Sequence, residues 1–234
     1  PASEITISNP STEKLDGFAS LGCHVTTSNI EAINSGAPLI FLCVKPWIVE
    51  KVIDEIYADL SASGATLGIV AAGLSVGDIR DSLPTSTEAC IVMPNTGLLV
   101  NNSTTLVVNI SCSVEALKHL REYLLMVGDV MQTTEKSLPA ATAIASCGIA
   151  YLMRYVRAAQ QAGVQMGLRA SEAQWLAASA MVAAGELLRL PGAHPETEID
   201  KVTTPGGLTI KGLNALDANG FTNAVIEAHL KSSK

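Results

Sequence analysis

The chain has 234 residues, with 22 Asp and Glu against 15 Lys and Arg, which gives a formal net charge of −7 at neutral pH. This acidic balance, without a dense Lys/Arg cluster, argues against nucleic acid as a partner. The hydrophobic fraction is 48% although aromatic residues make up only 4%, a composition that predicts closely packed helices, some of them buried between subunits.

The first part of the chain alternates short apolar runs with amphipathic ones. Strands are predicted at 4–8, 24–26, 39–44, 66–72, 89–93 and 104–110, and helices at 11–22, 47–60, 75–83 and 114–127. The continuously apolar run at 39–44 is typical of a parallel strand covered on both faces. Strands that alternate with helices predict an α/β fold with a doubly wound parallel sheet.

Three of the predicted strands end in unusual residues, at 44–46 (Val-Lys-Pro), 71–73 (Ala-Ala-Gly) and 93–96 (Met-Pro-Asn-Thr). Gly and Pro after a strand are often only turn residues, and that interpretation stays open for each one. Parallel sheets bind ligands at the carboxyl ends of their strands. Three such ends that include a lone Lys and an Asn favour a crevice for a flat polar ligand.

Strand patterns disappear after about Glu135. The segment at 139–167 is helical and Ala-rich, and 171–190 opens with a Ser/Glu cap and continues with small residues on all sides. The sequence therefore predicts a domain boundary between 135 and 136, followed by an all-helical domain over 136–234.

No membrane span, metal site or disulfide framework is predicted. The uncharged runs at 60–77 and 89–114 are interrupted by Gly, Ser, Pro or Asn, and the helical run at 173–185 is too short to cross a bilayer. The five cysteines are scattered, odd in number and without C-x-x-C spacing, and the four histidines are equally dispersed. These features predict a cytoplasmic protein without a bound metal.

The segment "KVTTPGGLTIKGL" at 201–213 places paired glycines at the start of a predicted helix. A helix start presents unpaired N–H groups and a partial positive charge, and glycine lets an anion approach them closely. Thr204, Gly207, Leu208 and Thr209 could thus form an anion cradle. A tight turn followed by an ordinary helix explains the spacing equally well, so both interpretations stay open.

Several segments resemble the pyrroline-5-carboxylate reductase family. They are "VKP", "AAGLS", "MPNT", "AQQAGVQMGL" and, most specifically, "HPETEIDKVTTPGGLTIKGLNAL", and they occur in the family's order through essentially the whole chain. The resemblance implies a Rossmann-like dinucleotide-binding domain at 1–135 and a helical dimerisation and substrate-binding domain at 136–234. It also implies a homodimer formed through the C-terminal helices, often within larger rings of dimers. The implied activity is NAD(P)H-dependent reduction of 1-pyrroline-5-carboxylate to L-proline, the last step of proline biosynthesis.

The same resemblance assigns roles to individual residues. The substrate carboxylate would bind Thr204 and the N–H groups of Gly207 and Leu208, with Gly206 in the turn, and Thr209 would be the catalytic residue that hydrogen-bonds the imine nitrogen. The cofactor would contact Ser8, Asn9, Asn29, Val44, Lys45, Pro46, Ala72, Gly73, Asn95, Thr96 and Ser146.

The cofactor preference follows partly from the residues themselves. An Asp or Glu at the end of the second strand of a dinucleotide fold usually holds the ribose 2'-OH and disfavours a 2'-phosphate. That place is occupied by Ser8 and Asn9. We therefore expect NADPH as the cofactor, with NADH as the alternative.

Two departures from the family pattern affect these expectations. The family begins with a strand and a Gly-rich G-x-G-x-x-M/G loop, and neither precedes "PASEITIS" at 1–8. The chain as given is therefore expected to bind cofactor poorly, which micromolar binding in an NADPH titration would contradict. At 145–151 the chain reads "ASCGIAY" where the family has S-G-S-G-P-A-Y. The residues stay small, but the serine hydroxyls stand at other positions than in the family. The affinity for the substrate is therefore expected to differ.

Two other functions stay open at this point. The anion cradle would accept many carboxylates, which allows a related Rossmann reductase of another small imino or keto acid. A non-catalytic homologue that dimerises but lacks the phosphate loop would show the same C-terminal pattern.

Overall fold

The computed structural model of the chain describes residues 1–71 and 73–233, which form two units, Pro1–Thr142 and Ala143–Lys234. The division falls later than the predicted boundary between 135 and 136, which lies at the start of the 3-10 helix η6 (Glu135–Ser137).

The first unit contains two sheets, a parallel pair β1-β2 and a five-stranded sheet in the order β3-β4-β5-β6-β7. The strands are β1 Thr6–Ser8, β2 His24–Thr26, β3 Leu39–Leu42, β4 Thr66–Ile69, β5 Ala89–Met93, β6 Ser103–Asn109 and β7 Gly128–Thr133. Each of the six predicted strands is present. The edge strand β7 was not predicted, because its residues alternate too weakly between apolar and polar.

The prediction of an all-parallel sheet is wrong for one pair. The ladders β3-β4, β4-β5 and β6-β7 are parallel, whereas β5 and β6 are antiparallel. The connection between them, at 94–102, contains only the 3-10 helix η4 (Thr96–Val100). It is shorter than the roughly twelve residues that a parallel crossover needs.

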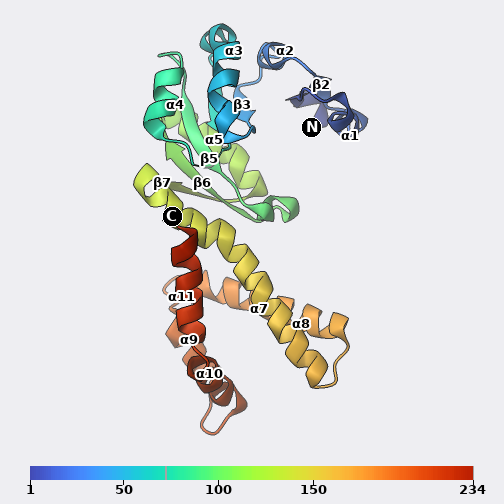
Figure 1. The fold of residues 1–234 in the computed structure, drawn as a ribbon, viewed down its shortest axis with the longest axis vertical. Helices are drawn as coiled ribbons and strands as arrows, with labels where there is room; N and C mark the ends of the chain where they lie inside the picture. The colour runs from blue at the N-terminus through green and yellow to red at the C-terminus, as the bar shows by residue number, and fades with distance from the viewer. Residues whose placement is uncertain (72, 234) are drawn as a thin grey trace. The chain divides into compact units, whose positions relative to one another are not determined.

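Helices α3 (Val49–Ser63) and α4 (Val76–Ser82) cover one face of the larger sheet and α5 (Val114–Leu124) covers the other. The other α-helices of this unit are α1 Asp16–Ser20, α2 Asn29–Ile33 and α6 Leu138–Thr142 (Figure 1). Further 3-10 turns are η1 Ala2–Glu4, η2 Thr12–Lys14, η3 Pro46–Ile48 and η5 Leu125–Val127. Along β5, Ala89 and Ile91 join the core under α3 and α4, while Cys90 and Val92 join the core under α5. Alternate side chains of a strand point to opposite faces, so the sheet is doubly wound as predicted.

Helix α3 shows how the sequence pattern produces this packing. Its buried residues are Val49, Ile53, Ile56 and Leu60, which recur on one helical face. The helix ends at Gly64, whose φ of +65° is the left-handed conformation that closes many helices. The predicted helix at 11–22 is wrong as a single element, because the structure divides it into η2 and α1.

The second unit is helical throughout its described residues, as predicted. It begins with a π-helix, η7 (Ala143–Cys147), and continues with α7 Gly148–Gln165, α8 Ala170–Leu188, α9 Pro195–Lys201, α10 Leu208–Ala218 and α11 Phe221–Ser232. Helices α7 and α8 lie side by side (Figure 1), and a Cβ added at Gly163 would lie 2.6 Å from the Cβ of Ala173. Small residues therefore permit the close approach of these two helices.

The predicted Ser/Glu cap at Ser171 is wrong, because the N-cap of α8 lies two residues earlier. Arg169 is the N-cap, and its backbone N–H donates to the Glu172 carboxylate at 3.1 Å. Hydrogen bonds from Arg169 also lower the pKa of Glu172 below its usual value. None of the helices in the described part of the chain combines the length and the apolar character needed to span a membrane.

The helical unit buries very little apolar surface on its own. Among its described residues, Ala143 and Ala173 are the buried hydrophobic side chains, while Met153, Trp175 and Val182 are 65%, 69% and 66% exposed. Monomeric proteins rarely leave so many large apolar side chains in water. The unit therefore carries the surface of an interface.

Candidate active site

The carboxyl ends of β3, β4 and β5 share one edge of the sheet because these strands are parallel. The structure brings most of the predicted cofactor residues of the first unit to this edge: Val44, Lys45 and Pro46 follow β3, Gly73 follows β4, and Asn95 and Thr96 follow β5. The predicted residue Ala72 lies outside the described residues. Among those at the edge, Lys45 is the only charged residue, which suits a ligand that carries phosphate groups.

The loop after β5 is held in one conformation by close backbone contacts. The Asn95 side-chain oxygen accepts a hydrogen bond from the Gly97 N–H at 2.9 Å, and the Asn95 N–H donates to the Ser103 hydroxyl at 3.2 Å. A Cβ at Gly97 would lie 2.3 Å from the Asn102 carbonyl oxygen, so only glycine fits there. These contacts hold Thr96 at the start of η4, beside the edge.

The predicted adenosine residues form a short hydrogen-bonded chain. Ser8 donates from its hydroxyl to the Asn29 side-chain oxygen at 2.8 Å, and the Asn29 amide donates to the Glu55 carboxylate on α3 at 3.2 Å. Asn9 accepts from the Ser11 N–H at 3.0 Å. Sequence reasoning missed Glu55, which lies 26 residues from Asn29, and no sequence pattern indicates that the two meet.

The paired glycines form a tight turn that brings Thr204 to the start of α10. Gly206 has a φ of +71°, and the Gly207 N–H donates to the Thr204 carbonyl at 2.9 Å. The expectation that the Gly207 N–H is free to bind a carboxylate is therefore corrected, because the turn already uses it. A Cβ at Gly207 would lie 2.6 Å from the Thr204 hydroxyl oxygen, so the threonine side chain lies directly against this glycine.

The first turn of α10 keeps its donors available. Gly207 is the N-cap and has no side chain to cap the helix, and within the described residues the N–H groups of Leu208, Thr209 and Ile210 have no hydrogen-bond acceptor. The turn is exposed, with Leu208 85% accessible. Unpaired N–H groups at a helix start, next to the Thr204 hydroxyl, are suited to a small carboxylate.

Ser146, the remaining predicted cofactor residue, lies in the π-helix η7 of the second unit. Its hydroxyl oxygen is buried and has no hydrogen-bond partner among the described residues. Buried hydroxyls are nearly always paired, and π-turns are frequent at functional sites. Both observations favour a ligand-binding role for this segment.

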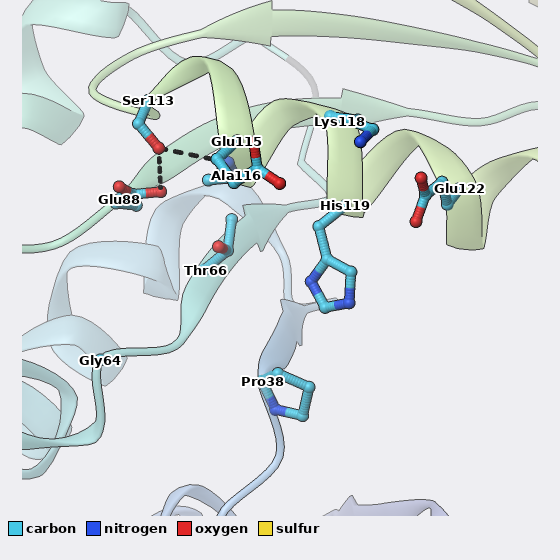
Figure 2. Close-up of a pocket in the computed structure, with 10 residues that line it drawn as sticks. All are labelled: Pro38, Gly64, Thr66, Glu88, Ser113, Glu115, Ala116, Lys118, His119 and Glu122. Carbon is cyan, nitrogen blue, oxygen red and sulfur yellow. Dashed lines mark hydrogen bonds between the residues drawn. The ribbon is translucent and has the colours of Figure 1, made fainter.

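A separate pocket of about 380 Å³ lies at the opposite edge of the sheet, at the amino ends of β3 to β5 (Figure 2). It is lined by Pro38, Gly64, Thr66, Glu88, Ser113, Glu115, Ala116, Lys118, His119 and Glu122. The Ser113 hydroxyl donates to the Glu88 carboxylate at 3.2 Å. Three glutamates against one lysine would repel phosphate groups, so this pocket does not suit a dinucleotide.

The sheet is covered on both faces and has polar residues at its carboxyl edge, and it is followed along the chain by a helical unit in which the start of α10 is uncapped. This is the arrangement of a Rossmann-type oxidoreductase. Comparison with known proteins identifies the particular family. Residues 135–234 match the domain family described as pyrroline-5-carboxylate reductase dimerisation. "Pyrroline-5-carboxylate reductase 3" of Danio rerio is 33% identical over 232 residues, which cover 97% of this chain and 79% of that protein. The chain belongs to the pyrroline-5-carboxylate reductase family.

Other relatives agree with this assignment. "Pyrroline-5-carboxylate reductase 1" of Dictyostelium discoideum is 32% identical over 99% of this chain, which spans only 44% of that protein. The crystal structure of Plasmodium falciparum pyrroline carboxylate reductase with NADP bound has a TM-score of 0.84 at 25% identity, covering 97% of this chain and 84% of that one. The enzyme of Coxiella burnetii has a TM-score of 0.88 at 25% identity, covering 98% and 86%. These structures confirm the predicted Rossmann-type fold with a helical dimerisation domain.

Proposed function

We propose that the protein reduces the C=N bond of 1-pyrroline-5-carboxylate to give L-proline, the last step of proline biosynthesis, with NADPH preferred to NADH. The observation that carries this proposal is the turn at 204–208, which leaves the N–H groups of the first turn of α10 uncapped beside the Thr204 hydroxyl. In a chain of this family, that arrangement supports binding of a small cyclic imino acid.

The uncharged donors of the turn bind and orient the substrate. The carboxylate binds the Thr204 hydroxyl and the Leu208 N–H, and the Thr209 hydroxyl hydrogen-bonds the imine nitrogen. Two anchor points on a small ring determine which of its faces is presented for reduction, and fixed geometry is a large part of catalysis in such reactions. When bound, the nicotinamide cofactor supplies the hydride.

The cofactor is proposed to lie along the carboxyl edge of the sheet. Lys45, Pro46, Asn95 and Thr96 would contact its nicotinamide half, and Asn29 its adenosine end. The Plasmodium falciparum relative carries NADP, which supports a cofactor of this class. Ser146, in the π-helix of the second unit, is proposed as a further cofactor residue, because its buried hydroxyl has no hydrogen-bond partner within the described residues.

The family match over 135–234 indicates that the protein forms a homodimer. The exposed apolar side chains of the helical unit support burial of this surface by a second copy. We extend the proposal to rings of dimers and to a cytoplasmic location, which the five free cysteines favour.

Replacing Thr209 by valine tests the proposed catalytic contact. The variant keeps the side-chain shape and loses the hydroxyl, so kcat for 1-pyrroline-5-carboxylate is expected to fall at least about tenfold, equivalent to roughly 1.4 kcal/mol of transition-state stabilisation. The measurement is NADPH oxidation followed at 340 nm, a wavelength at about the usual absorbance maximum of reduced nicotinamide.

The matched control is Thr203→Val. The Thr203 hydroxyl donates to the Asp200 carbonyl at 3.0 Å, at the end of α9, and has no role in the proposed site. Its kcat is expected to stay within about twofold of the parent. An unchanged kcat in Thr209→Val would remove Thr209 from catalysis, and turnover of another imino or keto acid in place of 1-pyrroline-5-carboxylate would refute the substrate.

The negative charge of Glu55 is expected to reduce the preference for NADPH over NADH. Its carboxylate accepts from the Asn29 amide, which in turn binds Ser8, so a negative charge lies close to the place proposed for the ribose 2'-phosphate. Glu55→Gln keeps the hydrogen bond and removes the charge. The KM for NADPH is expected to fall about threefold while the KM for NADH changes little, because only NADPH carries the extra charge. Equal shifts for both cofactors would contradict this effect.

A further inference from the structure

The imidazole of His229, near the end of α11, contacts the π-helix η7 at 143–147. Its Nδ1 lies 3.1 Å from the Ala143 carbonyl oxygen. Because a carbonyl can only accept, the imidazole donates from Nδ1–H. The ring also lies against the backbone after the π-helix, since a Cβ at Gly148 would be 3.4 Å from its Cε1.

The ring is itself held in place by Tyr151. The two rings make an edge-to-face contact with centroids 5.0 Å apart and an interplanar angle of 79°. The Tyr151 hydroxyl donates to the Ala228 carbonyl at 3.2 Å and is hydrogen-bonded to the Ser232 hydroxyl, both on α11. α7 and α11 are thus tied together on both sides of His229, which leaves the imidazole little freedom to turn away.

A π-helix is rarely stable by its own hydrogen bonds and persists where outside contacts support it. The Ala143 carbonyl begins this one, and Ala143 is only 1% exposed. The carbonyl that begins a π-helix accepts the backbone N–H five residues on, so the imidazole is a second donor to the Ala143 carbonyl. If the His229 donor were absent, this buried carbonyl would lose its outside hydrogen bond, and the turn would lose a contact that supports the π geometry against the ordinary α-helical one.

We propose that His229 is a positioning residue: its Nδ1–H holds the π-turn at 143–147 and thereby sets the place of Ser146, whose hydroxyl is buried and unpaired within the described residues. The inference rests on the proposed function, in which Ser146 is a cofactor-binding residue. His229 touches neither substrate nor cofactor in this proposal and acts only through the turn.

Two substitutions with side chains of the same shape distinguish loss of the hydrogen-bond donor of His229 from loss of packing. His229→Asn places an amide N–H close to the position of Nδ1, whereas His229→Leu has a similar volume and no donor. In His229→Leu we expect kcat to fall about tenfold with the KM for 1-pyrroline-5-carboxylate within about twofold, because the carboxylate turn on α10 is untouched. His229→Asn is expected to recover most of kcat.

A second readout does not depend on turnover. Cys147 is a free, partly buried cysteine at the end of the π-helix, so its rate of alkylation by iodoacetamide, followed by mass spectrometry of its peptide, reports opening of the turn. The rate is expected to rise at least about fivefold in His229→Leu and to stay near the parent value in His229→Asn. Ser232→Ala, which removes a Tyr151 contact on α11 but keeps the His229 bond, is expected to resemble the parent.

The outcomes are distinguishable. Equal alkylation in the parent and His229→Leu would overturn the proposal, and so would faster alkylation with an unchanged kcat. Turnover is measured on the full-length protein. If that parent protein does not reduce 1-pyrroline-5-carboxylate, the proposed function fails, while the alkylation rates still decide whether His229 holds the turn. Should His229→Leu not fold, His229→Gln moves the donor by one bond and is expected to change both readouts in the same direction.

Discussion

Replacement of Gly207 by alanine is expected to raise the KM for 1-pyrroline-5-carboxylate about thirtyfold, equivalent to roughly 2 kcal/mol of binding, which is the range of a hydrogen bond to a charged group. The added Cβ would lie 2.6 Å from the Thr204 hydroxyl oxygen and 2.9 Å from its carbonyl oxygen. The hydroxyl must therefore leave the start of α10, where the proposed carboxylate binds. Steady-state kinetics with varied substrate measures the effect.

The backbone conformation of Gly207 can be adopted by other residues. Its φ of −66° and ψ of 169° are allowed for alanine, so the effect comes from the contacts of the new Cβ with Thr204 and not from the backbone angles of residue 207. Gly212→Ala, in the same helix with nothing within 4 Å of the new Cβ, is the matched control and is expected to leave KM unchanged. A Gly207→Ala variant with the parental KM would show that the carboxylate binds elsewhere.

Replacement of Gly128 by alanine is expected to lower the free energy of unfolding by about 4 kcal/mol, the sum of a strained backbone and an overpacked contact. Gly128 begins β7 with a φ of +140°, and a Cβ there would lie 2.1 Å from the carbonyl oxygen of Ser103, its partner on β6. The two strands must separate at this point. Urea unfolding at fixed protein concentration measures the change.

Gly64→Ala measures the cost of a positive φ without the steric clash that an added Cβ makes at Gly128. Gly64 has a φ of +65° but nothing within 4 Å of an added Cβ. The loss there is expected to be about 1 kcal/mol, the cost of the left-handed conformation alone. Equal losses at Gly64 and Gly128 would mean that β7 moves aside easily, and that its pairing with β6 contributes little to stability.

Much of the candidate site could be predicted from the sequence. The residues after β3, β4 and β5 were predicted to share one edge, and parallel pairing of these strands brings them there. The turn before α10 was predicted from adjacent glycines, and Gly206 does adopt a positive φ. The roles of these residues toward substrate and cofactor stay predictions.

Other features could not be predicted, most of them because they depend on contacts between distant residues. Glu55 meets Asn29 only because α2 and α3 pack together. The bond from the Gly207 N–H to the Thr204 carbonyl is local, but the N–H was expected to be free because adjacent glycines allow several turns. The contact of His229 with the Ala143 carbonyl joins residues 86 positions apart.

The amino-acid sequence by itself determined the elements and the kind of fold. The spacing of apolar residues acts over one or two helical turns, which is why α3 and α5 and the continuously apolar strands could be recognised locally. Only the tertiary structure decided that β5 and β6 run antiparallel, that a π-helix opens the helical unit, and which N–H groups of the glycine turn stay available. The strand pairing and the π-helix depend on which buried polar groups find partners when segments distant in sequence pack against one another. The available N–H groups of the turn depend on which local hydrogen bond closes it, and the spacing of the glycines leaves that open.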